Sequence, residues 1–298
     1  MLAKVENLMT QMVESLNDRY VLELFEKVPK GKRLRAKLIL KIAGLSDDAY
    51  RLAAIVELIH AASLLHDDVI DDALTRRGEE SINSLFGNKT SIMLGDILYS
   101  KGFSQLTTLP NEVAYKISNA VALLSVGELL DVELSKSFNE NQEIYLDMIY
   151  KKTASLIEAA SASAAFLAKK DVGIYELYGR NLGLAFQVID DVLDITQDSE
   201  KLGKPSLHDF KEGKTTLPYM YLFERVNTED KQKLLGLFKK DLSQNDKIWI
   251  KNRMQETSSL NDSIIFAKNL GFEALNAIKS ENDDALSSII KDMIERDF

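Results

Sequence analysis

The stretch that decides the fold is residues 52–72, LAAIVELIHAASLLHDDVIDD, where a long apolar segment runs directly into four aspartates. Its leucine, isoleucine and valine residues recur every three or four positions, the period of a helix face that packs against a core. The same spacing continues along most of the 298 residues, and a period of two is nowhere sustained. The stretch therefore predicts a buried helix that carries acidic residues, within a mostly helical chain.

The use of proline and cysteine narrows the fold class. The chain has four prolines, and proline breaks helix interiors, so its scarcity fits long helices. It has no cysteine, which excludes disulfides, thiolate metal sites and cysteine nucleophiles and fits a reducing compartment. We expect one all-α domain over residues 1–298, a bundle of about ten to twelve helices joined by short turns.

Charge and hydropathy limit the partners. Acidic residues outnumber basic ones by 46 to 37, for a net charge of −9. Nucleic-acid binders show the opposite balance, so no nucleic-acid partner is expected. Residues 1–10 lack the apolar stretch of a signal peptide, and no run approaches the ~20 apolar residues that span a bilayer. We expect a cytoplasmic protein without a transmembrane segment.

One long stretch carries no helical period. Residues 197–216, QDSEKLGKPSLHDFKEGKTT, combine two glycines, a proline and several lysines interspersed with acids. Structureless stretches of this length in compact domains are typically lids or binding loops. We expect a lid-like loop here; a plain surface connection is the alternative.

The pattern Asp-Asp-x-x-Asp occurs twice, each time after an apolar run, as Asp67, Asp68 and Asp71, and as Asp190, Asp191 and Asp194. On a helix the first and last aspartate of each pattern face the same way. Burying carboxylates is costly unless a positive charge neutralises them, and no lysine or arginine lies within four residues of either group. Hard divalent cations such as Mg²⁺ are the natural partner. A solvated acidic face explains one group easily but two copies poorly.

Basic residues that suit phosphate are also grouped. They form the run of Lys30, Lys32, Arg33, Arg35 and Lys37, the pair Arg76 and Arg77, the segment Lys151-Lys152-Thr153, and Lys204 with Lys214. Arginine matches phosphate oxygens with two parallel hydrogen bonds, whereas lysine supplies a point charge. Each group alone is explained by a solvated surface. Together with the aspartates they indicate a pocket that binds two polyanions, one through metal and one directly.

Two other kinds of phosphate or metal site are disfavoured. A di-iron bundle needs two Glu-x-x-His motifs from different helices, and the chain has one, from Glu57 to His60. The phosphate-binding pattern GxxxxGK[ST] does not occur in the sequence.

Five ordered motifs carry a resemblance to a known family. They are Gly31 to Ala36, the first aspartate group with its Arg-Arg-Gly, the pair Lys152-Thr153, the segment Gly183 to Asp194, and the segment Gly203 to Pro218. With these motifs the chain resembles the trans-polyprenyl diphosphate synthases. Lys30 stands where the family has glycine, Ala36 where it has proline, and Leu207-His208 where Gly-Asp is usual. None of these departures removes a charged ligand.

The resemblance implies a homodimeric helical bundle around a deep central cavity, with the two aspartate groups facing each other at its mouth. It implies about three Mg²⁺ ions held by the six aspartates and bridging the diphosphate of an allylic substrate. The same diphosphate would contact Arg76, Lys152, Thr153, Gln187, Lys204 and Lys214. Isopentenyl diphosphate would be held by Lys32, Arg35, His60 and Arg77.

The implied reaction is head-to-tail condensation of isopentenyl diphosphate with an allylic diphosphate, by ionisation, condensation and elimination. In the family, the positions of Ala62 and Ser63, about one helical turn before the first aspartates, gate the cavity. Both are small here, which favours a long product of 30 to 50 carbons, with octaprenyl diphosphate the first choice. Farnesyl diphosphate is the expected allylic substrate. Close helix packing is the alternative explanation for both residues.

Three other functions stay open. A synthase of geranylgeranyl or farnesyl diphosphate differs only in product length. A class I terpene cyclase needs no isopentenyl site. The presence of all three basic residues expected for such a site, Lys32, Arg35 and Arg77, therefore disfavours a cyclase. A non-catalytic subunit of a heteromeric synthase is expected to lose aspartates, and both groups are complete. The pathway supplied, quinone side chains or another, also stays open.

Overall fold

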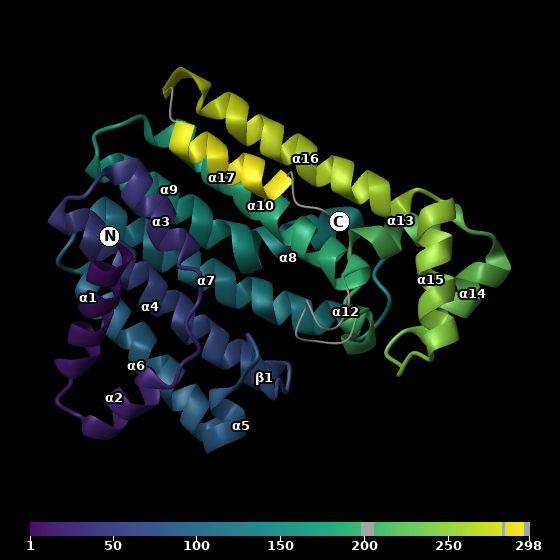
Figure 1. The fold of residues 1–298 in the computed structure, drawn as a ribbon, viewed down its shortest axis with the longest axis horizontal. Coiled ribbons are helices and arrows are strands. Elements are labelled where there is room, and N and C mark those ends of the chain that lie inside the picture. The colour runs from purple at the N-terminus through teal and green to yellow at the C-terminus, as the bar shows by residue number, and fades with distance from the viewer. Residues whose placement is uncertain (198–205, 282–283, 295–298) are drawn as a thin grey trace. The chain divides into compact units, whose positions relative to one another are not determined.

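The computed structural model describes residues 1–197, 206–281 and 284–294, and these residues are almost entirely helical (Figure 1). They divide into two compact units. Unit 1 comprises residues 1–122 and 156–176, and unit 2 comprises residues 123–155 and 177–298. The long helices α7 (Asn111–Leu134) and α10 (Val172–Thr196) contribute to both.

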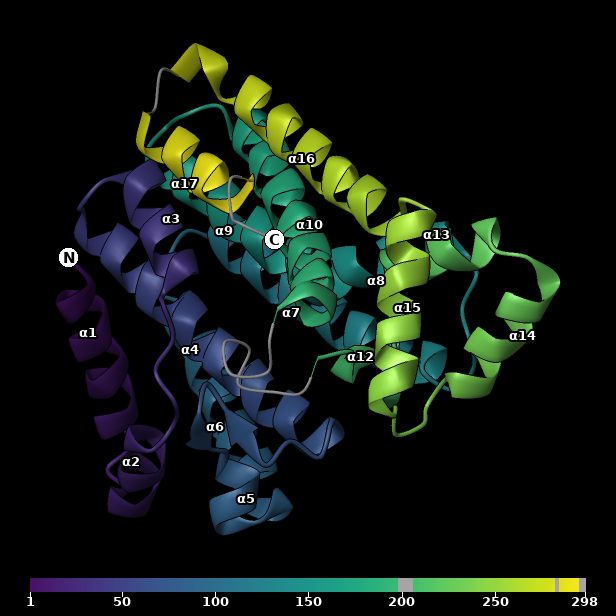
Figure 2. The same cartoon turned by 45° about the vertical axis from the view of Figure 1, so that its right-hand side comes forward.

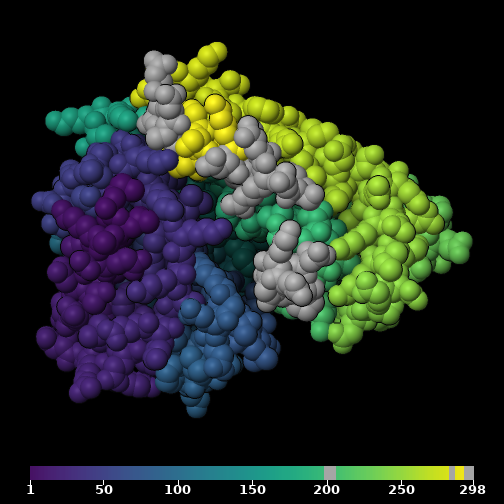
Figure 3. Space-filling view, viewed as in Figure 1, coloured from purple at the N-terminus to yellow at the C-terminus, as the bar shows by residue number. Residues whose placement is uncertain are grey.

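Unit 1 also contains two short strands. Its further elements are α1 (Leu2–Glu14), α2 (Arg19–Glu26), α3 (Leu34–Ala43), α4 (Asp47–Ile70), β1 (Thr75–Arg76), β2 (Glu79–Glu80), α5 (Ile82–Phe86), α6 (Asn88–Leu106) and most of α9 (Ser155–Leu167). Helices α1 and α2, in dark purple, lie at the surface of this unit (Figure 3).

Helix α4 is the centre of unit 1, as the opening stretch predicted. The side chain of Ser46 caps its first turn by accepting a hydrogen bond from the amide of Ala49, and two aspartates favour the same helix end. The helix then packs against α1, α3 and α6. Gly102 of α6 allows close approach, because a Cβ there would lie 2.8 Å from Cγ1 of Ile59. A helix buried on most sides needs apolar residues all round, which is what residues 52–65 supply.

A two-stranded hairpin was not expected from the sequence. Thr75 pairs with Glu80 and Arg76 with Glu79 in antiparallel register. The turn holds Arg77 and Gly78, both at positive φ. Two residues per strand are too short to show a period of two, so the Arg-Arg-Gly segment resembled a simple helix stop.

Unit 2 is built around the second half of α10. Its further elements are α8 (Gln142–Ile149), the π-helical turn η1 (Tyr150–Ala154), α12 (His208–Glu212), α13 (Leu217–Arg225), α14 (Thr228–Leu237), α15 (Gln244–Glu256), α16 (Ser259–Ala277), η2 (Lys279–Glu281) and α17 (Asp284–Ile294). Helix α16 runs beside α10 (Figure 2), where Asn181 donates to Glu273 over 3.1 Å. The hydroxyl of Tyr178 donates to the carbonyl of Leu286 in α17 over 3.0 Å.

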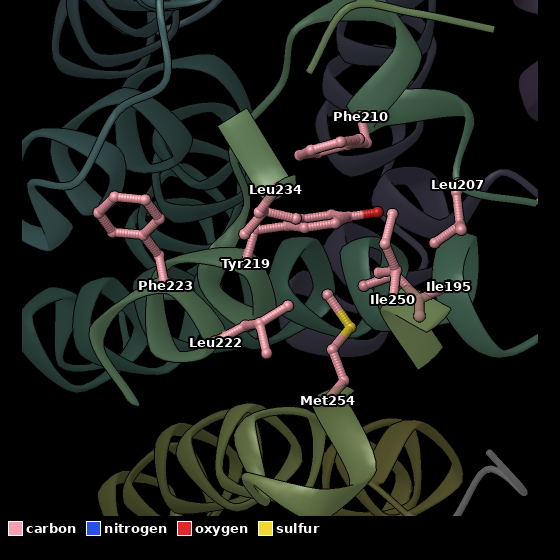
Figure 4. Packing of buried hydrophobic residues seen from close by; sticks show 9 residues of the cluster. All are labelled: Ile195, Leu207, Phe210, Tyr219, Leu222, Phe223, Leu234, Ile250 and Met254. Carbon is pink, nitrogen blue, oxygen red and sulfur yellow. The ribbon is translucent and has the colours of Figure 1, made fainter. Parts of the chain in front are cut away.

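The end of the expected lid-like loop belongs to a hydrophobic core. Leu207 and Phe210 are fully buried in a cluster with residues of α13 to α15 (Figure 4). The rings of Phe210 and Tyr219 stack with centroids 4.4 Å apart. The expectation of an irregular stretch is therefore wrong for residues 208–212, because two apolar residues three apart anchor the short helix α12, whereas residues 213–216 are irregular. Residues 198–205, including Lys204, lie outside the described residues.

The helix count is somewhat higher than expected. The described residues form more helices than the ten to twelve anticipated, because α5 and α12 have only five residues each. One turn of helix shows too few apolar repeats to be recognised by period. Within the described ranges, no helix is both long and apolar enough to cross a membrane.

The stacked pair in unit 2 gives a stability prediction. We expect Phe210→Ala to lower the free energy of unfolding by about 3–5 kcal/mol, because a fully buried aromatic ring is lost and a cavity remains. Phe272→Ala is the matched control, since Phe272 on α16 is 52% exposed and its loss should change stability by about 0.5 kcal/mol or less. Urea denaturation followed by circular dichroism measures both. Equal effects for the two variants would contradict the assignment of Phe210 to this core.

Candidate functional site

The first aspartate group lies at the carboxyl end of α4. Asp67 and Asp68 are in its last turn, and the helix ends one residue before Asp71. The amide of Asp71 still donates to the carbonyl of Asp67 over 2.9 Å. Carboxylates are disfavoured at this end of a helix, where the helix dipole is negative. Asp68 is also buried, and burial raises its pKa even though Arg76 opposes the shift. The group therefore needs a positive partner.

Arg76, one of the basic residues singled out in the sequence, supplies this positive charge. Its Nε donates to Asp68 over 2.5 Å and its Nη2 to Asp67 over 3.0 Å. No lysine or arginine lies within four positions of these aspartates in the sequence, and the ion pairs form over eight and nine positions instead. The β-hairpin turns the chain back and returns Arg76 to α4.

The segment between α4 and α5 is held by hydrogen bonds. The amide group of Asn83 donates to the carbonyls of Asp68 and Ala73, over 3.1 and 3.0 Å. The hydroxyl of Ser81 donates to the same carbonyl of Ala73 over 2.7 Å. These contacts hold the hairpin, and with it Arg76, in place.

Arg77, the residue after Arg76, belongs to a basic pocket. The pKa of His60 is lowered well below its usual range by burial and then by the charges of Arg35 and Arg77. Burial and the charge of Arg77 likewise lower the pKa of Arg35. The Nε of Arg35 is buried and has no hydrogen-bond partner among the described residues. We call His60, Arg35 and Arg77 the basic pocket; like charges gathered in this way suit an anion.

The other basic residues near this pocket differ from it. Arg33 is neutralised, because its Nε donates to Glu6 over 2.5 Å and its Nη1 lies 3.4 Å from the buried Glu57. Lys32 is exposed. The guanidinium of Arg77 contacts the backbone at Gly31 closely. A Cβ built on Gly31 would lie 2.6 Å from Nη1 of Arg77. Of the predicted isopentenyl ligands, Arg35, His60 and Arg77 are thus brought together, and Lys32 stands at the surface.

The two predicted gate residues have different surroundings. Ala62 is completely buried. Ser63 is partly exposed, and its hydroxyl donates to the carbonyl of His60 over 2.9 Å. Ser63 therefore retains accessible surface one turn before the first aspartates, whereas Ala62 does not.

The second aspartate group lies near the end of α10 in unit 2. Asp191 is buried and accepts two hydrogen bonds, from the hydroxyl of Tyr145 over 2.5 Å and from Gln187 over 2.9 Å. Its pKa is raised well above the usual range by burial and then by the charge of Asp209. Asp194 is also buried and accepts from the amide of Asp209 over 3.2 Å. Both side chains are thereby held in place by protein donors.

The predicted lysine and threonine lie on the π-helical turn η1. The Nζ of Lys152 lies 2.6 Å from Asp131 and 3.0 Å from Glu128, both on α7. The hydroxyl of Thr153 donates to Gln187 over 2.7 Å. Since Gln187 in turn donates to Asp191, η1 is connected to the second aspartate group by two hydrogen bonds in series.

Lys214 pairs with an acid two residues before it. Its Nζ lies 2.9 Å from Glu212, which also lies 2.9 Å from the imidazole of His208. Burial alone would raise the pKa of Glu212, but His208 and Lys214 lower it to about 2. In this structure all three predicted diphosphate cations within the described residues, Arg76, Lys152 and Lys214, are paired with acids.

The donor set fits a divalent cation that is also held by its substrate. Both aspartate groups offer only carboxylate oxygens, the ligands that Mg²⁺ and Ca²⁺ prefer. Within the described part of the chain, no three acidic or histidine side chains are arranged to hold a metal unaided. Mg²⁺ usually keeps waters and takes one or two carboxylates together with substrate phosphates. The two groups suit that mode and not an all-protein cage.

Sequence reasoning missed the residues that hold the site in place. Tyr145 and Asp209 contact the second aspartate group from other elements, and no local pattern singles them out. Glu128 and Asp131 could have been noticed, since acids three apart share a helix face. From the sequence, this part of the chain, residues 120–134, was expected only to supply residues at the far end of the cavity, so its acids were not considered.

The fold and the two aspartate groups define a class of all-α enzyme, and comparisons identify the family. The model of the family described as polyprenyl synthetase matches residues 18–254. A short chain isoprenyl diphosphate synthase of Methanothermobacter thermautotrophicus is 37% identical over 219 residues, 70% of this chain and 67% of that protein.

Solved structures agree. The octaprenyl pyrophosphate synthase of Helicobacter pylori superimposes with a TM-score of 0.95 at 42% identity, covering 99% of this chain and 98% of that one. A polyprenyl synthase of Caulobacter crescentus, solved with calcium and isoprenyl diphosphate, gives 0.91 at 31% identity, covering 99% and 94%. This chain belongs to the polyprenyl synthetase family and is a prenyltransferase. The resemblance read from the motifs is confirmed.

The basic pocket gives a prediction about His60. We expect its imidazole to remain neutral at pH 6.5, because burial and the charges of Arg35 and Arg77 lower its pKa. In Arg77→Gln the pKa of His60 should rise, since one repelling charge is removed. Two-dimensional NMR of ¹⁵N-labelled histidine measures both titrations. A His60 that titrates in its ordinary range in the unaltered chain would contradict the described pocket.

Proposed function

We propose that this prenyltransferase condenses isopentenyl diphosphate with an allylic diphosphate to make a polyprenyl diphosphate. One observation carries the proposal. Two consecutive arginines divide between neighbouring sites of unit 1: Arg76 binds the carboxylates of Asp67 and Asp68, and Arg77 faces Arg35 and His60. An acidic site and a basic pocket side by side suit two diphosphates, one held through metal and one held directly.

In this proposal the two aspartate groups hold divalent cations together with the allylic diphosphate. The six ligands are Asp67, Asp68, Asp71, Asp190, Asp191 and Asp194. Bound Mg²⁺, for which we propose about three ions per site, would neutralise charge that develops on the leaving diphosphate. Arg76, Lys152 and Lys214 would exchange their carboxylate partners for the same diphosphate, with Lys204 as a fourth cation.

Gln187 and Thr153 have a more indirect part in this proposal. The carboxamide of Gln187 is engaged on both sides, accepting from Thr153 and donating to Asp191. Because its hydrogen bonds already run along that path, we propose that Gln187 orients Asp191 and that Thr153 orients Gln187. Contact with the diphosphate would then fall chiefly to the cations.

Isopentenyl diphosphate is assigned to the basic pocket. The buried Nε of Arg35 and the forked guanidinium of Arg77 would donate to its phosphate oxygens. A neutral His60 can add a hydrogen bond without adding repulsion between positive charges, and the exposed Lys32 would close the pocket. The double bond of this substrate would attack the allylic cation, and the departing diphosphate would accept the proton that is lost. No nucleophile–histidine pair is then needed.

The names of the relatives differ in product length, one being a short-chain and one an octaprenyl enzyme. We propose a long product, octaprenyl diphosphate first, from farnesyl diphosphate. Its support is the small, partly exposed side chain of Ser63, one turn before the first aspartates. The fully buried Ala62 would contribute by keeping neighbouring side chains close. A geranylgeranyl-length product is the competing outcome.

We further propose that residues 1–298 act as one catalytic domain and that two copies form a homodimer. Both units carry residues of the proposed reaction, so neither suffices alone. For the dimer, the support is a row of exposed apolar side chains on α7, namely Tyr115, Val126, Leu129 and Val132. Such a row on one helix is typical of a protein contact, and a second copy is its proposed occupant.

The metal proposal is tested with Asp67→Ala and Asp190→Ala. Each should lower kcat by about two to three orders of magnitude while the fold is kept, because charge stabilisation of the leaving group is lost. Chelation of divalent cations should abolish turnover of the unaltered chain. Asp241→Ala is the control, since that side chain is 88% exposed and far along the sequence from both groups.

The assay is incubation with farnesyl and isopentenyl diphosphates and Mg²⁺, with products sized by mass spectrometry. Turnover near the unaltered rate in both aspartate variants would refute the metal assignment. Hydrocarbon products formed without isopentenyl diphosphate would show a terpene cyclase. Absence of any product from the pure chain would favour a non-catalytic subunit.

The chain-length proposal is tested with Ser63→Phe. The larger ring should shorten the product, because it fills the space that the growing chain would enter one turn beyond the diphosphate. Ser137→Phe, at an exposed loop position, is the control for adding the same ring elsewhere. An unchanged product distribution in Ser63→Phe would show that Ser63 does not line the path of the chain.

A further inference from the structure

Two glycines on different helices lie against the same π-helical turn of unit 2. A Cβ built on Gly127 of α7 would lie 2.3 Å from the amide nitrogen of Lys152 and 2.8 Å from its Cα. A Cβ on Gly183 of α10 would lie 2.6 Å from the Cα of Ala154 and 2.8 Å from its Cβ. Carbon atoms pack at about 3.5–4.0 Å, and a backbone cannot rotate away as a side chain can. Both helices therefore reach η1 this closely only because these residues are glycine.

Each glycine is followed, four residues later, by a side chain that binds η1. Asp131 lies 2.6 Å from the Nζ of Lys152. Gln187 accepts a hydrogen bond from Thr153 over 2.7 Å. Residues four apart share a helix face, so each glycine and its polar partner face η1 together. Close approach and hydrogen bonding are thus parts of one packing arrangement, repeated on the two helices.

The arrangement continues one turn further on α10. Asp191 follows Gln187 by four residues and accepts a hydrogen bond from it over 2.9 Å. Gly183, Gln187 and Asp191 therefore share one face of the helix. A shift of η1 away from α10 would break the hydrogen bond from Thr153 that orients the carboxamide of Gln187, which is one of the two donors to Asp191.

We propose that Gly127 and Gly183 are positioning residues for prenyl transfer, which set the depth of η1 and thereby the places of Lys152, Thr153 and Asp191. The inference rests on the proposed function and adds two residues to it that have no side chain of their own. Turns of π-helix occur frequently at functional sites. Here the turn presents Lys152 to one helix and Thr153 to the other.

The test uses Gly127→Ala and Gly183→Ala, with Gly236→Ala as the matched control. Gly236 lies within helix α14, and nothing lies within 4 Å of a Cβ built on it. After folding is checked by circular dichroism, kinetics are measured well below the lowest melting temperature. We expect kcat/KM for the allylic diphosphate to fall by about 10- to 100-fold in the first two variants. KM for isopentenyl diphosphate should stay within about twofold, because the basic pocket lies in unit 1.

Double-mutant cycles separate positioning from mere support of the fold. Gly127→Ala should add little in a Lys152→Ala background, and Gly183→Ala little in a Gln187→Ala background, since each glycine acts through that side chain. Independent effects would multiply. Multiplying effects, a parallel rise in KM for isopentenyl diphosphate, or kinetics like those of Gly236→Ala would overturn the inference.

Asp131→Asn keeps the test decisive if Gly127→Ala does not fold. It removes the nearer of the two carboxylate charges that hold Lys152 without adding bulk, and it should reproduce the selective loss in kcat/KM for the allylic diphosphate. An Asp131→Asn variant with unaltered kinetics would count against the inference. If the unaltered chain and all glycine variants are equally active, only this inference fails. If the unaltered chain shows no prenyl transfer, the proposed function itself fails.

Discussion

Asp68 and Asp191 are carboxylates with almost no exposed surface, and a buried charge without compensation costs several kcal/mol. The rest of the site follows from this constraint. In unit 1 the compensation is a guanidinium, brought by a hairpin to the end of α4. In unit 2 it is a pair of donors, Tyr145 on α8 and Gln187 one turn earlier on α10 itself. The two groups share a sequence pattern, but their charges are compensated by different means.

This difference gives the two groups different chemistry. Arg76 is a charged partner whose guanidinium fork matches carboxylate and phosphate oxygens equally well. Tyr145 and Gln187 are fixed donors that orient one carboxylate. The first group is therefore compensated by a positive charge, and the second by neutral donors that fix its orientation.

The basic pocket has the opposite charge imbalance, an excess of positive charge. Arg35 and Arg77 lower the pKa of His60, and Arg77 also lowers that of Arg35. Positive charges gathered in this way repel one another and destabilise the fold, a cost that natural proteins tolerate mainly at functional sites. A bound dianion would relieve it. An acidic site and a basic pocket therefore lie close together in unit 1, and the function proposed above depends on that difference in charge.

The sequence alone determined the helical class, the centre of unit 1 and the identity of the charged residues, because period, proline scarcity and local motifs are properties of neighbouring residues. It also located the paired motifs that identify the family. It failed for the hairpin and for α12, which are too short to show a period. It named Arg76 but did not pair it with Asp68, because the two lie eight residues apart in the sequence. Only the tertiary structure decided which side chain compensates the charge of each buried aspartate. Contacts such as Tyr145 with Asp191, or Gly127 with Lys152, join residues 46 and 25 positions apart, and no local pattern carries information over that distance.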